Sequence, residues 1–261
     1  MHIDGLTALA GVLVGAIVGI TGVGGGSLMT PILVLLFGIA PQTAVGTDLL
    51  YASITKVFGT AVHHNHGTVD WQIVRRLACG SLPAAALTLT WMSIQEANRV
   101  KSGFIIDAVG VALIITSLGM LFKDWLHGLG RKLRVGDSER FKHVQPVLTV
   151  MAGVVLGVLV TLTSVGAGAL GTVMLVYLYP FRMRPARLVG TDIVHAIPLT
   201  IVAGTGHLLM GNVDLKLLGQ LLIGSVPGII LGSTLAGKMP EAGLRWAISV
   251  VLSIAAFKLL M

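Results

Sequence analysis

The chain has 261 residues, of which 54% are hydrophobic and 11% are charged, and its mean hydropathy is +0.90. A soluble domain carries about 25% charged residues, so this composition excludes an ordinary soluble protein and indicates an integral membrane protein. The formal net charge of +7 comes from basic residues between the apolar stretches. The positive-inside rule produces that pattern, so the charge does not indicate nucleic-acid binding. A single cysteine, Cys79, excludes an intrachain disulfide.

Ten apolar segments are predicted to be helices, and a charged stretch divides them into two groups of five. In chain order they cover residues 6–20, 28–39, 46–62, 72–92 and 103–122, and then 147–161, 170–180, 188–209, 216–236 and 244–260. The second segment of each group is too short to cross about 30 Å of hydrocarbon alone. The sequence therefore predicts a first transmembrane repeat over residues 1–122, a solvated cytoplasmic linker over 123–146, and a second transmembrane repeat over 147–261.

The two groups share residues at one constant spacing. Val45-Gly46-Thr47-Asp48 recurs 144 residues later as Val189-Gly190-Thr191-Asp192. The residues that follow recur at the same distance, in the pairs His63 and His207, Gly67 and Gly211, Asp70 and Asp214, Gly80 and Gly224, Ser81 and Ser225, and Pro83 and Pro227. Paired interrupted hydrophobic segments in two halves are typical of transporter binding sites.

Loop charges favour repeats that run in opposite directions. If the first two segments of each repeat form a re-entrant hairpin or a pair of crossings, 13 basic residues lie on one side and 4 on the other. If they form one broken crossing, the division is 10 against 7. The positive-inside rule favours the first arrangement. The predicted fold is an all-α polytopic helix bundle of two inverted repeats, each with a glycine-broken short-helix hairpin and three transmembrane helices.

A glycine-rich cluster precedes the short second segment of each repeat. Glycine interrupts a helix and lets the backbone approach a ligand. The first amide groups of the next helix, near Ser27 and near Ala169, lack intrahelical partners and favour an anion. The alternative is that the glycines only permit close helix packing. We hypothesise that both clusters bind the substrate near the midplane, through Thr21, Gly22, Gly24, Gly25, Gly26, Ser27, Thr163, Ser164, Gly166 and Gly168.

Each third segment carries a Thr-Asp pair. Thr47 and Thr191 are expected to complete the substrate site, and Asp48 and Asp192 to couple transport to protons or to tune the local field, because ionisable groups in membrane segments are functional candidates. The alternative for both pairs is a helix N-cap, in which the side-chain oxygen accepts a hydrogen bond from an unpaired amide.

Two further ionisable residues break the symmetry of the third segments. Lys56 lies about two turns inside its segment, needs a counter-charge from Asp48 or Asp192, and is expected to bind the substrate anion. The alternative is a purely structural ion pair. His195 stands where the first repeat has Tyr51. Its titration range suits proton coupling, and the alternative is a hydrogen-bonded interior histidine.

The run His63-His64-Asn65-His66 suggests a metal site only weakly. His63 alone has a counterpart, and no second cluster of metal ligands follows. We predict histidines at helix ends on the membrane surface, with Gly67 and Gly211 closing those helices. Asp70 and Asp214 are predicted to cap the next helices. No metal, cofactor or catalytic residue is expected.

The glycine clusters and the Thr-containing pairs together resemble the TauE/SafE family of sulfite and sulfonate exporters. The resemblance rests on Gly22 to Gly26 with Pro31, on Ala44 to Thr47, and on the second copy in Ser164 to Gly168 and Val189 to Thr191. The family commonly has Thr-Ser where this chain has Thr-Asp. The resemblance implies export or import of sulfite, organosulfonates or related organic anions.

The expected function is secondary transport of a small anion across a bacterial inner membrane, coupled to protons, by alternating access of the inverted repeats. The expected partners are the anion, protons and the lipid bilayer, without nucleic acid. The central linker is expected in the cytoplasm and both termini outside. An anion channel, or an intramembrane enzyme acting on a sulfur compound or lipid head group, is the alternative, with Cys79 as the candidate nucleophile.

Overall fold

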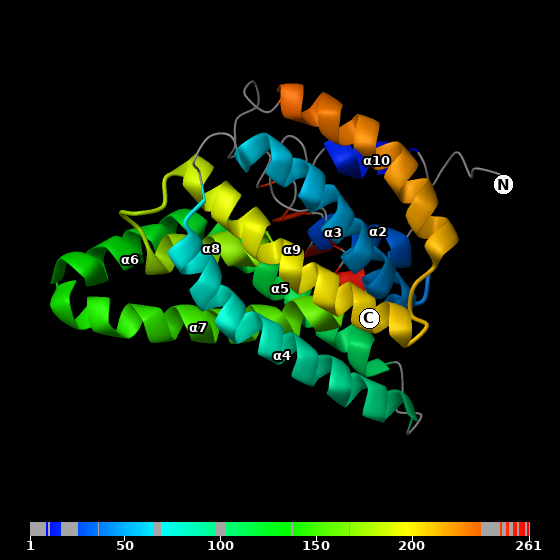
Figure 1. Ribbon diagram of the computed structural model, residues 1–261, viewed down its shortest axis with the longest axis horizontal. Coiled ribbons are helices and arrows are strands. Elements are labelled where there is room, and N and C mark those ends of the chain that lie inside the picture. The colour runs from blue at the N-terminus through cyan, green and yellow to red at the C-terminus, as the bar shows by residue number, and fades with distance from the viewer. Residues whose placement is uncertain are drawn as a thin grey trace.

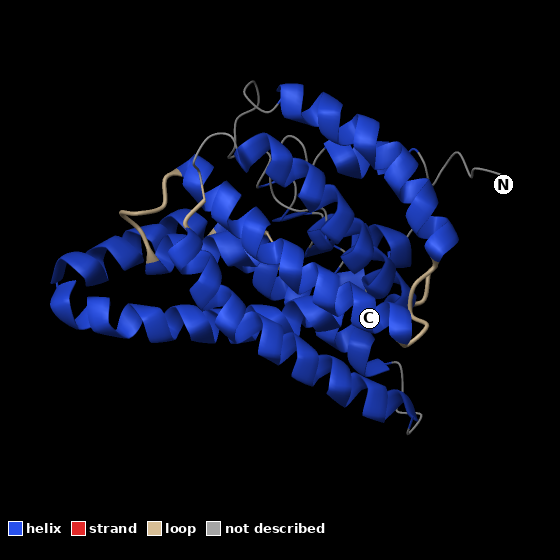
Figure 2. Cartoon of the chain, in the orientation of Figure 1, coloured by secondary structure: helices blue, strands red, loops and turns tan. Residues whose placement is uncertain are grey.

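The computed structural model describes residues 9, 11–16, 26–35, 37–64, 69–97, 103–136, 138–166 and 168–235, and scattered positions between 246 and 260. Helices are the only regular structure among these residues (Figure 2). Figure 1 labels α2 (Gly26–Leu35), α3 (Pro41–His64), α4 (Trp71–Ala97), α5 (Gly103–Leu121), α6 (Lys123–Gly136), α7 (Ser138–Thr163), α8 (Ala169–Leu178), α9 (Pro185–Leu209) and α10 (Leu215–Leu235).

The predicted polytopic membrane helix bundle is confirmed. Three described helices contain stretches long and apolar enough to cross a membrane, in α4 (Trp71–Ile94), α7 (His143–Thr163) and α9 (Ala186–Leu209). The short second segments are also confirmed, because α2 and α8 have 10 residues each. At 1.5 Å per residue such a helix is about 15 Å long, roughly half the hydrocarbon thickness.

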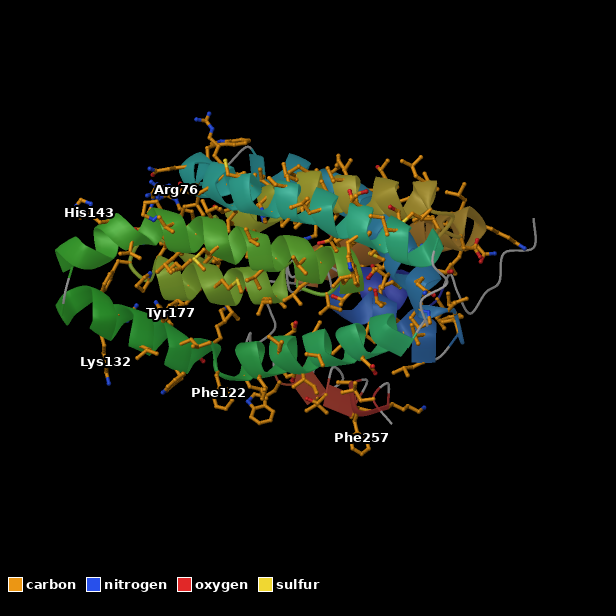
Figure 3. All side chains as sticks on the ribbon, turned by 90° about the horizontal axis from the view of Figure 1, so that it is seen from below. Arg76, Phe122, Lys132, His143, Tyr177 and Phe257 are labelled. Atoms are coloured by element: carbon orange, nitrogen blue, oxygen red, sulfur yellow. The ribbon has the colours of Figure 1, made fainter. Side chains whose placement is uncertain are left out.

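The charged stretch after α5, predicted as a solvated linker, is helical over most of its length. Residues Lys123–Gly136 form α6, and α7 begins at Ser138. Leu126 and Leu129 lie one turn apart and are half-buried, which gives α6 an apolar face beneath its charges. That face packs against α8. Figure 3 shows Lys132 and His143 at the same end of the molecule as Arg76.

The centre of the bundle is an antiparallel pair made by α3 and α9, the equivalent helices of the two repeats. Gly46 near the start of α3 lies against the backbone of Asn212, just after the end of α9. Further along, Gly204 of α9 lies against Leu50 of α3. The start of one helix therefore meets the end of the other, and Figure 1 shows the two side by side.

Each repeat also contributes a helix that packs on the other repeat through glycine. A β-carbon at Gly153 of α7 would overlap with the carbonyl oxygen of Leu77 in α4. The equivalent contact joins Gly11, in the helical residues 11–16, to Leu221 in α10. A β-carbon added at Gly11 would lie 2.6 Å from the Leu221 carbonyl oxygen. The next turn repeats the pattern, with Gly157 against Ser81 and Gly15 against Ser225.

Replacing Gly153 with alanine is expected to destabilise the bundle by about 1–3 kcal/mol, because the backbones of α4 and α7 must separate. The matched control is Gly219→Ala in α10, where an added β-carbon has nothing within 4 Å. We expect a lower Tm in detergent for Gly153→Ala, and an unchanged or slightly higher Tm for the control because alanine favours helix. Equal Tm values for the two variants would contradict the close packing.

Candidate functional site

The two Thr-Asp pairs lie inside helices and are not N-caps. Helix α9 begins with Pro185 and α3 begins at Pro41, so both pairs lie about two turns inside their helices. Proline at the first position starts each helix well before the apolar pattern begins. The N-cap alternative for Asp48 and Asp192 was therefore wrong.

The threonines of the pairs instead bind the opposite repeat. Thr47 Oγ1 accepts a hydrogen bond of 3.0 Å from the backbone N–H of Asp214, and Thr191 Oγ1 accepts one of 2.9 Å from the backbone N–H of Asp70. These contacts join the start of each central helix to the start of α10 or α4. They are reciprocal, since equivalent residues make both.

The predicted caps at Asp70 and Asp214 are confirmed. Asp214 Oδ1 accepts the N–H groups of Lys216 and Leu217, each at 2.9 Å. Asp70 Oδ1 accepts the N–H of Ile73 at 3.4 Å, in the first turn of α4. The same aspartates therefore cap a helix with the side chain and bind a threonine of the other repeat with the backbone.

Asp48 is fully buried where α3 meets α2 and the end of α7. Thr30 of α2 donates a hydrogen bond of 2.6 Å from its hydroxyl to Asp48 Oδ2. The Ser164 side chain, from the second repeat, lies next to the same carboxyl. Asp48 Oδ1 and Ser164 Oγ have no hydrogen-bonding partner among the described residues. An unpaired buried carboxylate oxygen is costly, so this place can accept a proton or a donor group.

Lys56 is buried between the two predicted carboxylates. It lies two turns after Asp48 on α3, and it interacts electrostatically with both Asp192 and Asp48. Asp192 is buried on α9. Lys56 on α3 is thus within electrostatic range of two buried carboxyl groups that lie toward opposite ends of the α3–α9 pair. The three residues Asp48, Lys56 and Asp192 are here called the charged cluster.

The second glycine cluster starts a helix as predicted. Helix α8 begins at Ala169, preceded by Gly168 at φ 136° and Gly166 at φ 114°, which only glycine adopts readily. Ser164 also has a positive φ of 56°, a strained conformation for a residue with a side chain. The hydroxyl of Thr163 donates to the Leu159 carbonyl within its own helix, at 2.6 Å.

A protein carboxylate lies at the start of α8. A β-carbon at Gly171, the third residue of α8, would overlap with Asp192 Oδ1. The positive end of a helix dipole favours an anion at this place, and Asp192 supplies one.

Of the first glycine cluster, the described residues include only its end, where α2 begins. Helix α2 begins at Gly26, close to the predicted start at Ser27. The Ser27 side chain and the four earlier residues of the predicted site lie outside the described residues, namely Thr21, Gly22, Gly24 and Gly25.

The buried histidines of α9 are hydrogen-bonded in the interior. His195 Nε2 lies 2.9 Å from Ser81 Oγ of α4. Tyr51, the equivalent of His195, is buried on α3 beside Ser225 of α10, the equivalent of Ser81. His207 lies in the last turn of α9, as expected of a helix-end histidine, and it is completely buried, with Nε2 2.9 Å from the Thr161 carbonyl oxygen.

Of the two glycines predicted to close the histidine-containing helices, only Gly211 lies among the described residues. Gly211 closes α9 with φ 78°, as predicted. Gly67, like residues 65 and 66, lies outside the described residues, and the side chains of His63 and His64 are not described.

Sequence reasoning missed Thr30 and Arg182, and it noted Ser81 in the repeat without connecting it to His195. Thr30 could have been found, because its counterpart Thr172 lies 142 residues later, the spacing of the two glycine clusters. No pattern pointed to Arg182, which lies in the connection between α8 and α9 and binds Asp70 at 2.6 Å.

Comparison with known proteins agrees with this architecture. The family model for sulfite exporter TauE/SafE matches residues 7–259. The Bacillus subtilis protein "Probable membrane transporter protein YjnA" is 40% identical over 211 residues, covering 80% of this chain and 81% of the relative. "Probable membrane transporter protein YdhB" of the same organism is 26% identical over 252 residues, covering 95% and 96%. No solved structure matches the chain. The chain therefore belongs to the TauE/SafE family, and it is a multi-pass membrane transporter, not an enzyme.

Proposed function

We propose that this chain carries a small anion, such as sulfite, an organosulfonate or a related organic anion, across a bacterial inner membrane together with protons. The observation that carries the proposal is the charged cluster of Asp48, Lys56 and Asp192. Its members are buried on α3 and α9, the equivalent helices of the two repeats, with Lys56 within electrostatic range of both carboxyl groups. Ionisable groups at such a place mark transport paths and proton relays.

Alternating access between two inverted repeats is the proposed mechanism. Equivalent helices that run antiparallel support it, since an inverted pair is related by an axis in the membrane plane. The reciprocal bonds of Thr47 and Thr191 give further support, because each repeat then makes the same contact with the other. Rocking of one repeat against the other would exchange which end of the central pair is open.

Charge balance supports proton coupling. If all three groups of the charged cluster are ionised, its net charge is −1, and a bound anion would add a second negative charge. Like charges repel strongly where the dielectric constant is low. A proton on one carboxylate offsets that repulsion, so the anion and the proton would bind together.

Asp192 supplies a structural route for this coupling. Its carboxylate lies at the start of α8, the place proposed for the substrate anion. When Asp192 takes a proton, the helix end and Lys56 lose a competing negative charge and can hold the anion head group. The glycine clusters, Thr47 and Thr191 would then shape the site, and Asp48 with Thr30 would provide a second proton position.

We place the α6–α7 end of the bundle in the cytoplasm. Arg76, Lys132 and His143 lie at this end of the molecule (Figure 3). Arg131, next to Lys132, lies 5.9 Å from the Phe181 ring centroid. A concentration of basic residues favours the cytoplasmic side, and both termini would then lie outside.

Uptake into proteoliposomes tests the proposed function. We expect saturable movement of sulfite, a short organosulfonate or a small carboxylate that speeds up when the side of addition is made acidic. Liposomes without protein control for the diffusion of undissociated acid. Flux that neither saturates nor responds to a proton gradient would indicate an anion channel, and failure of all three anion classes would overturn the proposal.

A further inference from the structure

The two ends of the central helix pair are built differently. At one end Asp70, Thr191 and Arg182 meet, here called the Asp70 junction. At the other end Asp214 and Thr47 meet, here called the Asp214 junction. Both junctions contain the same threonine-to-backbone hydrogen bond, of 2.9 and 3.0 Å. They differ in what the aspartate side chain binds.

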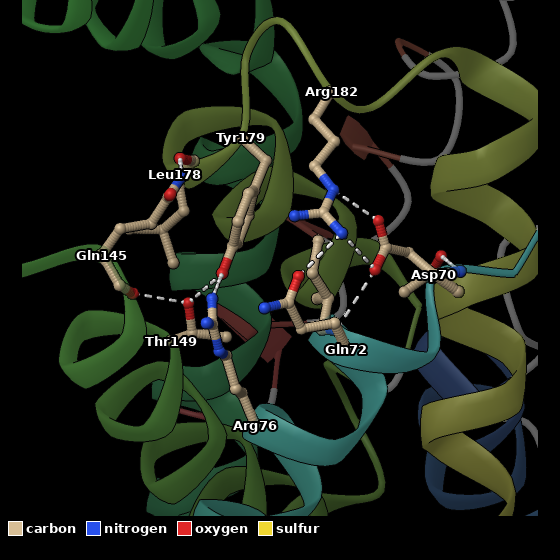
Figure 4. A network of polar contacts seen from close by, with 10 residues as sticks. Asp70, Gln72, Arg76, Gln145, Thr149, Leu178, Tyr179 and Arg182 are labelled. Carbon is tan, nitrogen blue, oxygen red and sulfur yellow. Dashed lines mark hydrogen bonds and ion pairs between the residues drawn. The ribbon is translucent and has the colours of Figure 1, made fainter. Parts of the chain in front are cut away.

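The Asp70 junction contains a bidentate ion pair (Figure 4). Arg182 donates from Nε to Asp70 Oδ2 at 2.6 Å and from Nη2 to Asp70 Oδ1 at 2.8 Å, and Nη2 also donates to Gln72 at 2.9 Å. The Asp70 side chain is 5% exposed and that of Arg182 39%. Bidentate arginine–carboxylate pairs are among the stronger polar contacts in proteins. Asp70 therefore joins α4, α9 and the connection between α8 and α9.

Further polar contacts fasten the same connection. Tyr179, which follows α8, has its hydroxyl 2.7 Å from Thr149 Oγ1 of α7, and Arg76 of α4 donates to it at 3.3 Å. Gln145 of α7 donates to the Leu178 carbonyl. Figure 4 shows these residues beside the ion pair. At this end, two sets of polar contacts hold the α8–α9 connection against α4 and α7.

The Asp214 junction has no such ion pair among the described residues. Asp214 Oδ1 accepts hydrogen bonds only from the first turn of its own helix. The position that matches Arg182 at the repeat spacing is Gly38, which has φ 64° and no side chain. The neighbouring Phe37 and Ile39 instead belong to an apolar cluster with Leu217 and Leu218 of α10.

We propose that the Asp70–Arg182 ion pair makes the Asp70 end of the transport path harder to open than the Asp214 end. The inference rests on the alternating access proposed above. Opening the Asp70 end must separate the threonine contact and also break a half-buried bidentate ion pair. Among the described residues, opening the Asp214 end separates the equivalent threonine contact and apolar side chains, and it breaks no ion pair of Asp214. The resting protein therefore opens preferentially at the Asp214 end.

Matched cysteine reporters test this asymmetry without any substrate. Leu188 and Ala44 are equivalent positions, near the start of α9 and of α3, and both are buried. Each is changed to cysteine in a Cys79→Ala background, because Cys79 is exposed. The full-length protein is placed in nanodiscs, where a membrane-impermeant maleimide reaches both faces. In the parent we expect Ala44→Cys to be labelled faster than Leu188→Cys.

Removing the ion pair should change one reporter only. We expect Arg182→Ala to speed labelling of Leu188→Cys by about tenfold, the effect of roughly one charge-assisted contact, and not to speed labelling of Ala44→Cys. Asp70→Asn keeps a capping side chain and should give the same result, and the double variant should add nothing further. Arg187→Ala serves as a control, because it removes an exposed charge from α9, the helix that carries the Leu188 reporter.

Three outcomes would overturn the proposal. Leu188→Cys could be labelled within about twofold of the parent in both Arg182→Ala and Asp70→Asn. Both reporters could speed up together, which would indicate general loosening of the fold. The parent could label faster at Leu188→Cys than at Ala44→Cys. Arg182→Lys, which keeps the charge, provides a folded comparison if Arg182→Ala fails to fold. A failure of anion transport with the labelling result intact would count against the proposed function alone.

Discussion

Replacing Lys56 with methionine is expected to lower anion transport by about 100-fold or more. Methionine nearly preserves the volume of the side chain but removes its charge, which leaves Asp48 and Asp192 buried without their common partner. Removing one member of a buried charged group costs about 3–5 kcal/mol. A loss of about 3 kcal/mol in the binding of the anion corresponds to about 100-fold.

The control for Lys56 is Lys216→Met on α10, where the side chain is exposed. This variant removes the same charge and should transport at the parent rate. Uptake into proteoliposomes provides the measurement, with Tm in detergent to separate lost function from lost folding. The double variant Lys56→Met with Asp192→Asn should recover stability but not transport. Normal transport by a folded Lys56→Met protein would exclude Lys56 from the anion site.

The helical architecture could be predicted because the hydropathy pattern and the sequence repeat both indicate where helices begin and end. The short helices α2 and α8 follow from glycine clusters that interrupt apolar sequence, and the caps at Asp70 and Asp214 follow from residue type at a helix start. Each of these features depends on neighbours in sequence.

The errors arose where distant parts of the chain decide the outcome. The Thr-Asp pairs looked like caps because the apolar pattern begins beside them, whereas Pro41 and Pro185 start the helices earlier. Residue type could not show that His207, at the end of α9, is buried against the Thr161 carbonyl of α7. The charges of the α6 segment predict a solvated linker, although its half-buried leucines give it an apolar face, and the helix packs against α8.

The site itself was only half visible in the sequence. Each ionisable residue stood out as polar within an apolar segment, but spacing could not say which groups would meet. Because α3 and α9 pack against each other, Lys56 interacts electrostatically with two carboxylates, one from its own helix and one from the other repeat. The crossing also puts Asp192 against α8, where an empty anion site had been expected.

Replacing Asp192 with asparagine is expected to uncouple transport from the proton gradient. The parent should move its anion faster as the side of addition becomes more acidic, because protonation of a carboxylate removes a competing negative charge. Asparagine has no charge to lose, so anion binding should no longer need a proton. We expect uptake by Asp192→Asn to be nearly independent of external pH, while exchange of labelled for unlabelled anion continues.

The variant Asp48→Asn distinguishes the contribution of Asp48 to proton coupling from that of Asp192. Asparagine can still accept the hydrogen bond that Thr30 donates, so the local geometry should survive. If Asp192 carries the coupling proton, Asp48→Asn keeps some pH dependence and the double variant loses all of it. Asp107→Asn, at an exposed position on α5, serves as the control and should behave as the parent. Full pH dependence in the double variant would remove both carboxylates from the coupling step.

The position of Asp192 explains why one residue can link the two bound species. Lys56 and the start of α8 both attract negative charge, and the ionised Asp192 satisfies both at once. A substrate anion must therefore compete with this carboxylate for Lys56 and the start of α8. A proton on Asp192 removes the competing charge without moving the backbone. A Thr-Ser pair at this place would offer no such competition. We accordingly expect Asp192→Ser to bind the anion without a proton, giving the same pH-independent uptake as Asp192→Asn.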